Sequence, residues 1–307
     1  MQIPRPHHTT TRPRFVSRKG DEIHREWYNG AVARTSESVV QQPMIKKIHY
    51  CWFGGPLPAN VAANVETWRR LNPDFELCEW NEGNTDVSAW EFGRRALQNK
   101  RWGFVSDIVR LQALHAHGGV YLDTDVELIH PLSTLEPEGD FLVLGYIFNC
   151  ALGTAVLSSP PRHPLLPELL AEYHCVRPEA WPVNNSVFTD FFINRVPGFL
   201  LNGRRWVSGS SRVSVYPKEY FEQPAFTRER GVAIHHCSGS WMQKNAGTGF
   251  KTEGRGDPHK VKWLKRQVRT FVNCLRSPYR AAHLQALCGR RVPQVSAWRS
   301  SAGSDHD

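Results

Sequence analysis

The chain has 307 residues, of which 40% are apolar and 11% aromatic, enough to bury one sizeable core. Its seven cysteines are odd in number, scattered and without a CxxC pair, which argues against a disulfide framework or a zinc site. The net charge of +9 lies at the two ends, since residues 1–42 carry +3, 251–307 carry +8 and 43–250 carry −2. A nearly neutral middle is atypical of a nucleic-acid enzyme, so no nucleic-acid partner is expected.

Residues 1–42 have the composition of a disordered or loosely attached basic arm. They contain no apolar run of seven or more, so we expect neither a signal peptide nor a membrane span there, and we expect a cytoplasmic protein. The chain then divides into a folded domain at 43–250 and a basic helix and tail at 251–307.

The first half of the domain alternates strands and helices. Strands are predicted at 45–52, 75–80 and 120–122. Helices are predicted at 59–71, ended by Asn72-Pro73, at 87–100, and at 106–117, with Ser106 as the N-cap and Gly118-Gly119 at the end. This alternation predicts an α/β fold with a mostly parallel sheet flanked by helices.

The second half contains further strands, predicted at 142–148, 150–157, 213–216 and 232–236, and a helix at 165–175. Within 199–207, Asn202-Gly203 is typical of a hairpin turn. Asn184-Asn185 and Thr189-Asp190 lie next to an aromatic-rich stretch and are candidates for ligand contacts.

Residues 261–275 differ in character, because apolar residues recur at helical spacing and lysines and arginines occupy much of the remaining surface. This pattern predicts a basic amphipathic helix. Two interpretations stay open: the helix docks on the domain with its basic face in solvent, or residues 260–276 bind an anionic membrane surface peripherally at its inner face.

Asp123 and Asp125 follow the apolar strand at 120–122. Side chains two residues apart on a strand point to the same side, so both carboxylates are expected to project together. Paired carboxylates suit a hard divalent cation, which keeps positions open for water and for diphosphate oxygens. The pair therefore indicates an enzyme that acts on a nucleoside-diphosphate compound.

The surroundings of this pair match a longer pattern: Ser-Asp, two residues, Arg, and later Gly-Gly-x-Tyr-x-Asp-x-Asp. The matching residues are Ser106, Asp107, Arg110, Gly118, Gly119, Tyr121, Asp123 and Asp125. The stretch resembles the DXD sugar-binding region of glycosyltransferases that include initiating mannosyltransferases, bacterial capsular polysaccharide transferases and, more distantly, the clostridial glucosylating toxins. The resemblance implies a GT-A fold, a divalent metal (Mn²⁺ or Mg²⁺) and transfer of a hexose with retention.

Two further segments resemble the same families. Residues 48–55 are similar to their first strand and turn, where Trp52 would stack on the base of the donor. Residues 234–241 are similar to their late His and Ser-Trp segment, which makes His236 a candidate metal contact and Ser240 and Trp241 candidates for binding the diphosphate.

By the same resemblance, Asp107 and Arg110 would contact the sugar, ribose or phosphate, and Tyr121 would hydrogen-bond the donor. Asp123 would bridge ribose and metal, and Asp125 would bind the cation directly. A UDP-sugar is the expected donor, and a glycan, lipid-linked or polysaccharide acceptor, as in capsule synthesis, is the expected partner.

Three alternatives remain. A protein-glycosylating effector of the same fold would suit the arm at 1–42. An aspartate-based phosphatase also carries Asp-x-Asp after a strand, but Glu127 stands where it needs Thr or Val. A non-catalytic basic binding protein would use the two charged ends and would need neither aspartate.

Overall fold

A computed structural model describes residues 43–177, 179–223, 231–237 and 259–291. The first half of the described chain is the alternation β1 (Lys47–Cys51), α2 (Ala59–Leu71), β2 (Glu76–Trp80), α3 (Glu91–Gln98), α4 (Trp102–His117) and β3 (Gly119–Leu122). It continues through β4 (Val126–Leu128), the 3₁₀ helix η1 (Leu132–Glu138), β5 (Leu142–Phe148), β6 (Ala151–Ser159), α5 (Leu165–Glu172), the 3₁₀ turn η2 (Tyr173–Cys175) and α6 (Asn184–Arg195). The last elements are β7 (Trp206–Ser208), β8 (Val213–Tyr216), α7 (Lys218–Phe221), β9 (Ala233–His235), α8 (His259–Arg276) and α9 (Arg280–Leu287).

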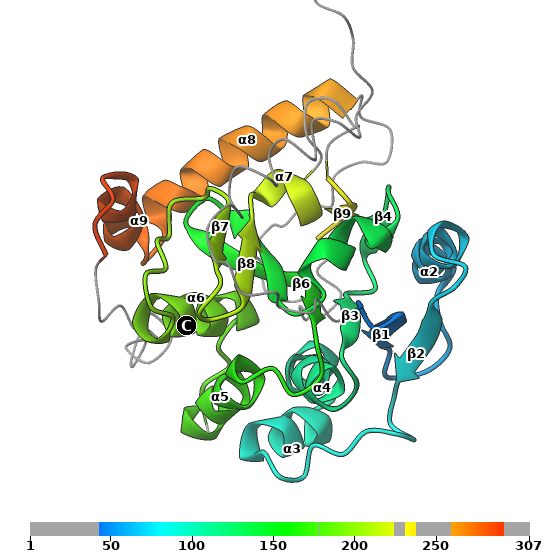
Figure 1. Cartoon of the computed structure of the whole chain (residues 1–307). Coiled ribbons are helices and arrows are strands. Elements are labelled where there is room, and N and C mark those ends of the chain that lie inside the picture. The colour runs from blue at the N-terminus through cyan, green and yellow to red at the C-terminus, as the bar shows by residue number, and fades with distance from the viewer. Residues whose placement is uncertain (1–42, 178, 224–230, 238–258, 292–307) are drawn as a thin grey trace, which may run out of the picture. The chain divides into compact units, whose positions relative to one another are not determined.

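The main sheet has seven strands in the order β2-β1-β3-β6-β5-β8-β7. Pairing is parallel for β1–β2, β1–β3 and β5–β8 and antiparallel for β3–β6, β5–β6 and β7–β8, so five strands run in one direction, with β6 and β7 opposed. The predicted α/β fold with a mostly parallel sheet is therefore confirmed. A separate antiparallel pair, β4–β9, lies beside α7 (Figure 1).

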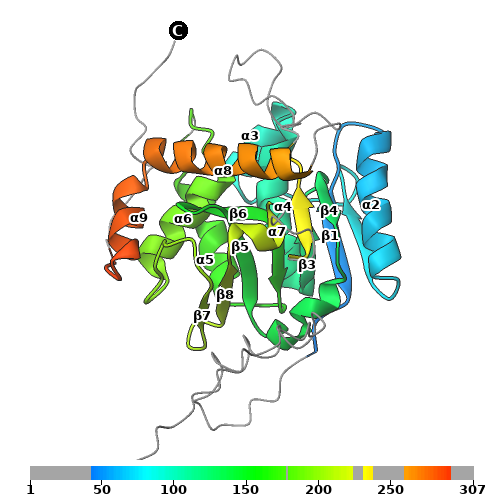
Figure 2. The same cartoon turned by 90° about the horizontal axis from the view of Figure 1, so that it is seen from above.

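Apolar side chains fill both faces of the sheet. On one face, α3, α4, α5 and α6 contribute to a cluster around Ile108, Leu114 and Phe188. On the other face, α2, η1 and α7 enclose a second cluster around Ile48 and Trp68. Figures 1 and 2 show these helices covering the sheet, with α8 lying next to α7 and α9 following it. Such two-sided coverage is what a mostly parallel sheet requires.

The turn from α4 into β3 depends on two glycines. Gly118 and Gly119 have φ of 65° and 100°, the left-handed region that glycine adopts without steric cost. A Cβ on Gly118 would lie 2.6 Å from Pro161, and one on Gly119 would lie 2.6 Å from the carbonyl oxygen of Lys47. Only glycine therefore lets the strand that leads to Asp123 enter the sheet at this point.

Several sequence predictions need correction. Ser106 does not cap α4, which begins four residues earlier; its Oγ donates to the carbonyl of Trp102 inside the helix at 3.0 Å. Asn202-Gly203 forms a bend rather than the hairpin turn, because the antiparallel strands β7 and β8 are joined by residues 209–212. The predicted helix at 87–100 is shorter, at Glu91–Gln98. The sequence pattern also missed β4, α6 and α9.

The described residues contain no helix that is both long and apolar enough to cross a membrane.

Candidate functional site

Arg110 lies at the centre of the site, on the face of α4 that packs under β3 and β6. Its side chain is buried, and its guanidinium donates to Asp107 Oδ1 at 2.9 Å, to the carbonyl of Thr154 at 2.7 Å and to the carbonyl of Ser106 at 3.2 Å. It also stacks over the Tyr121 ring, 4.6 Å from the centroid. The guanidinium is thus held in one orientation from several directions.

Asp107 and Asp123 balance this buried charge. Asp123 Oδ1 lies 3.3 Å from Arg110 Nη1 and accepts a hydrogen bond from the Tyr121 hydroxyl at 3.0 Å. Burial by itself lowers the pKa of the Arg110 guanidinium, but the charge of Asp123 raises it above its usual value, so Arg110 stays charged. Burial raises the pKa of the Asp107 carboxyl to about 7, against the opposing effect of Arg110.

The two aspartates of the DXD motif converge, although not on an extended strand. β3 ends at Leu122, and residues 123–126 form a tight turn closed by a hydrogen bond from the Val126 N–H to the Asp123 carbonyl at 3.0 Å. The Asp123 N–H in turn bonds the Ala155 carbonyl of β6 at 2.8 Å. The turn keeps both carboxylates at the carboxyl end of β3, where ligands of such sheets bind.

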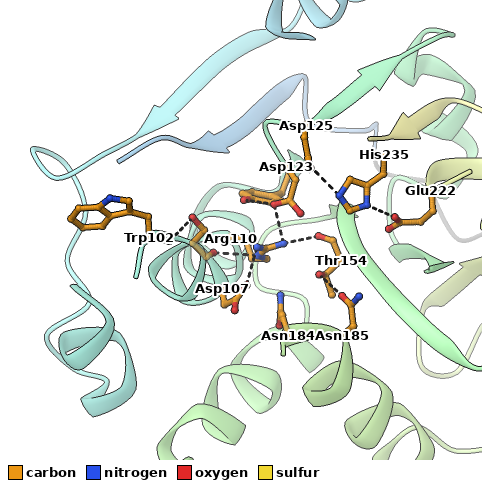
Figure 3. A network of polar contacts seen from close by, with 12 residues as sticks. Trp102, Asp107, Arg110, Asp123, Asp125, Thr154, Asn184, Asn185, Glu222 and His235 are labelled. Carbon is orange, nitrogen blue, oxygen red and sulfur yellow. Dashed lines mark hydrogen bonds and ion pairs between the residues drawn. The ribbon is translucent and has the colours of Figure 1, made fainter. Parts of the chain in front are cut away.

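His235 completes this group (Figure 3). Its Nε2 lies 3.2 Å from Asp125 Oδ1, and ligand atoms of Asp123, Asp125 and His235 all lie within 4.8 Å of one another. The other ring nitrogen, Nδ1, faces Glu222 Oε2 at 2.5 Å. Gly153 leaves room for that carboxylate, because a Cβ at this position would overlap Glu222 Oε1. We call Asp123, Asp125, His235 and Glu222 the carboxylate–histidine cluster.

The cluster fits a divalent cation. Two carboxylates and one imidazole are metal ligands found in binding sites for divalent cations such as Mn²⁺. A histidine that binds a metal usually donates its other N–H to a carboxylate, which fixes its orientation, and Glu222 is placed for that. Burial alone lowers the pKa of His235, but Cys237, Asp125 and Glu222 raise it well above its usual value. The negative charges that favour a proton on His235 also favour the binding of a metal cation beside it.

The histidine in the cluster is one residue before the predicted one. β9 ends at His235, which faces Asp125, while the next residue, His236, is exposed and contacts Glu127 Oε2 at 3.1 Å. In the described fold, His235 rather than His236 therefore lies beside the two aspartates. Ser240 and Trp241 lie outside the described residues.

Trp52 follows β1 and packs, partly buried, against the apolar cluster around Ile48 and Trp68. Its indole N–H donates to the Gly55 carbonyl at 2.9 Å. It therefore points away from the face that carries Arg110 and Tyr121. A second tryptophan, Trp102, lies at the start of α4 and stacks on Phe53 with 5.8 Å between ring centroids. Figure 3 shows it at the edge of the site.

α6 adds two asparagines from the opposite side of Arg110 (Figure 3). Asn185 Oδ1 accepts a hydrogen bond from the Thr154 hydroxyl at 3.0 Å. Asn184 is buried and accepts a hydrogen bond from the Tyr173 hydroxyl, while its Nδ2 has no partner among the described residues. By contrast, Thr189 is structural, because its hydroxyl accepts the Leu152 N–H and donates to the Asn185 carbonyl. Asp190 is buried on the same helix.

Sequence reasoning missed Glu222, His235 and Thr154. No local motif marks Glu222, which lies 13 residues before His235. Thr154 acts through its backbone carbonyl, which no residue type signals. The adjacent pair His235-His236 was a usable signal for β9, but which of the two faces Asp125 depends on the pairing of β9 with β4.

A mixed α/β sheet with paired aspartates at the end of a central strand, next to a buried arginine, is an arrangement suited to nucleotide-sugar enzymes. Residues 58–142 match the family model described as a glycosyltransferase sugar-binding region containing a DXD motif. This range includes Asp107, Arg110, Tyr121, Asp123 and Asp125. The match supports a glycosyltransferase, and DXD glycosyltransferases generally bind a divalent metal.

Curated relatives are distant and match only part of the chain. "Subversion of eukaryotic traffic protein A" of Legionella pneumophila is 29% identical over 131 residues, which cover 34% of this chain and 20% of that protein. "Uncharacterized glycosyltransferase L373" of Acanthamoeba polyphaga mimivirus is 25% identical over 170 residues, covering 50% and 65%. The chain thus spans less than two thirds of either relative. Among solved structures, "PaToxG Glycosyltransferase" is 17% identical with a TM-score of 0.41, covering 51% of this chain and 71% of that one. A TM-score this low carries no conclusion.

Proposed function

We propose that the protein is a metal-dependent, retaining glycosyltransferase that moves a hexose from a nucleotide sugar, a UDP-sugar by preference, to a glycan, lipid-linked or polysaccharide acceptor. The observation that carries the proposal is the convergence of Asp123, Asp125 and His235, with ligand atoms within 4.8 Å, directly beside the buried Arg110. Asp123, Asp125 and His235 can hold a cation on a diphosphate, and Arg110 can hold the sugar attached to that diphosphate.

Asp123, Asp125 and His235 would hold the cation, with Mn²⁺ preferred. When bound, the cation neutralises charge that develops on the diphosphate as the glycosidic bond breaks. Glu222 keeps the His235 ring in the orientation that offers Nε2 to the site. Arg110 adds a fixed positive charge that needs no reorganisation during the reaction, which is usually the largest catalytic contribution.

The sugar would lie between α4 and α6. Asp107 offers carboxylate oxygen to sugar hydroxyls, and the unpartnered Nδ2 of Asn184 offers a buried donor to the same ligand. The roles proposed for Trp52, Tyr121, His236, Ser240 and Trp241 in donor or metal binding stay predictions. Retention is proposed from the family resemblance; the acceptor hydroxyl would then attack from the face of the leaving diphosphate, whose oxygen would take the proton.

The test is donor hydrolysis by the full chain with Mn²⁺ and a panel of UDP- and GDP-sugars, with nucleotide release as the measurement. We expect release from one UDP-sugar, loss with EDTA, and at least a 100-fold decrease in Asp125→Asn, because one anionic ligand is lost. Asp74→Asn, at an exposed carboxylate paired with Lys46, is the matched control and should keep wild-type activity. Release that is unchanged in Asp125→Asn would refute the proposal.

The rival functions make different predictions in the same assay. An aspartate-based phosphatase would hydrolyse a simple phosphomonoester, and a non-catalytic binding protein would release no nucleotide under any condition. Neither is favoured by the family match over residues 58–142. The donor that the panel identifies separates a GDP-mannose enzyme, as in the mannosyltransferase branch, from one that uses a UDP-sugar.

A further inference from the structure

Helix α8 packs against the rest of the described chain through polar side chains. Its two buried residues with described side chains are Arg266 and Thr270, exposed by 7% and 3%. Arg266 Nη1 donates to the Glu222 carbonyl at 3.2 Å, and the Thr270 hydroxyl accepts a hydrogen bond from Gln223 at 3.2 Å. The inner face of this amphipathic helix is therefore hydrophilic, and it contacts the segment that carries Glu222.

The apolar face of α8 points away from the protein. Four residues at positions i, i+4, i+7 and i+11 form one line along the helix, which we call the apolar stripe: Leu264, Val268, Phe271 and Leu275. Their exposures are 58%, 55%, 65% and 45%. α9 adds Leu284 and Leu287, exposed by 51% and 47%. Of the two interpretations that the sequence left open, docking describes α8 in part: the helix packs on the domain with Lys265 and Arg276 exposed, but its apolar side chains are exposed as well.

An exposed stripe of this length requires an explanation. Single exposed leucines are normal on a protein surface, whereas contiguous apolar side chains mark a surface that another body covers. α8 has 18 residues and is about 27 Å long, so the stripe extends along most of that length. Figures 1 and 2 show α8 beside α7, with α9 continuing from its end.

The charge around the stripe identifies what covers it. Residues 258–304 contain ten lysines and arginines and no aspartate or glutamate. Lys265 and Arg276 are exposed on α8, and Arg280 is exposed at the start of α9. Two copies of the stripe packed together would bring these positive charges close, with no acidic residue on either helix to offset them. The partner must therefore be both apolar and anionic.

We propose that α8 lies in the plane of an anionic lipid surface. The apolar stripe enters the boundary between headgroups and acyl chains, and Lys265, Arg276 and Arg280 contact the headgroups. The proposal does not depend on the reaction that the site performs. If the proposed function holds, the hydrophilic face of α8 would keep the segment carrying Glu222 near the lipid surface, which suits a lipid-linked acceptor.

The test is flotation of the full chain with vesicles of phosphatidylcholine alone or with about one third phosphatidylglycerol. We expect the wild type to float only with the anionic vesicles, and less at high salt, because exposed charges are screened. The double substitution Val268→Ser and Phe271→Ser should lower the partition coefficient at least tenfold. Lys265→Gln, Arg276→Gln and Arg280→Gln should each lower it about fivefold.

The matched control removes apolar surface elsewhere. Leu97 and Val183 are exposed by 38% and 46% on other elements, so Leu97→Ser with Val183→Ser should leave flotation unchanged. All variants should retain the wild-type circular dichroism spectrum, since the altered side chains are exposed. The proposal is overturned if the wild type does not float with anionic vesicles, or if control and stripe variants lose binding equally. It is also overturned if sedimentation shows that the wild type is a dimer, that only the stripe variant is a monomer, and that neither protein binds vesicles.

Discussion

Glu222 shows how a residue with no local sequence signal can determine the properties of the site. It is 2% exposed in its side chain, it lies against His235 Nδ1, and Gly153 provides the space for its carboxylate. A buried carboxylate is stable only where hydrogen bonds or charges compensate its lost hydration. Its position behind the imidazole therefore indicates a role in orienting His235 toward Asp125.

Substitution Glu222→Gln keeps the size of the side chain and removes its charge. We expect the dissociation constant for Mn²⁺ to rise about 10- to 100-fold, the usual effect of losing a carboxylate behind a metal-binding histidine. Titration calorimetry with Mn²⁺ measures it, and saturating Mn²⁺ should restore most of the activity. Glu219→Gln, at a neighbouring carboxylate paired with Lys218, is the control. Equal Mn²⁺ affinity in Glu222→Gln and the wild type would contradict this role.

Arg110 illustrates the opposite case, a residue whose type and spacing were informative. Asp107 and Arg110 lie three apart on α4, a spacing that places both side chains on one face of the helix. The structure adds contacts with the Thr154 carbonyl and Asp123, which sequence could not provide because they come from β6 and from the turn after β3. A lysine could not satisfy these directions with one ammonium group.

At the scale of elements, the turn at Gly118-Gly119 determines how α4 is followed by β3. Gly118→Ala would place a Cβ 2.6 Å from Pro161 at a φ of 65°, so both overlap and backbone strain act together. We expect a loss of roughly 2–4 kcal/mol in the free energy of unfolding.

Urea denaturation followed by tryptophan fluorescence measures this loss. Gly209→Ala is the matched control, because a Cβ there meets no atom within 4 Å and its φ is not in the left-handed region. If both variants have the wild-type midpoint, the steric account of the turn is wrong.

Elements with strong local signals were predictable. α2 ends at Leu71 as expected, because Asn72 and Pro73 cannot continue it, and β5 and β8 have the expected bounds. The start of α4 was not predictable, because a serine can lie inside a helix as well as cap it. The Ser106 hydroxyl bonds the Trp102 carbonyl from an interior position. For α8, the spacing of the apolar residues predicted the helix but not which of its faces docks. The docking face depends on the polar groups of Glu222 and Gln223, which the helix contacts.

The candidate site was predictable only in part for the same reason. The carboxylates of Asp123 and Asp125 are close in sequence, so spacing alone brings them together. His235 and Glu222 reach them through the β4–β9 pair and α7, and a shift of one residue in that pairing would present His236 instead. Long-range register is therefore what sequence reasoning lacked.

At the scale of the whole molecule, two fully buried histidines link folding to pH. In each ring one nitrogen donates and the other accepts. His49 Nε2 bonds the Gly118 carbonyl at 2.9 Å while Nδ1 accepts from Trp80 at 3.2 Å. His163 Nε2 bonds the Arg212 carbonyl at 2.9 Å while Nδ1 accepts from the Leu165 N–H at 3.3 Å. Protonation of Nδ1 in either ring would break the hydrogen bond that this nitrogen accepts, so both rings are neutral.

Burial lowers the pKa of both histidines to about 4, below the value of 6.5 of an unperturbed histidine. Between these values the unfolded chain binds more protons than the folded chain, so the stabilisation is complete above pH 6.5 and decreases as the pH falls toward 4. Each histidine should cost about 2 kcal/mol of stability at pH 5 relative to pH 7.5. Urea denaturation at the two values measures the difference. His49→Gln should reduce the pH dependence, whereas His174→Gln, at an exposed histidine, should keep the wild-type profile. If His49→Gln kept the full pH dependence of the wild type, the neutral, buried state of this ring would be contradicted.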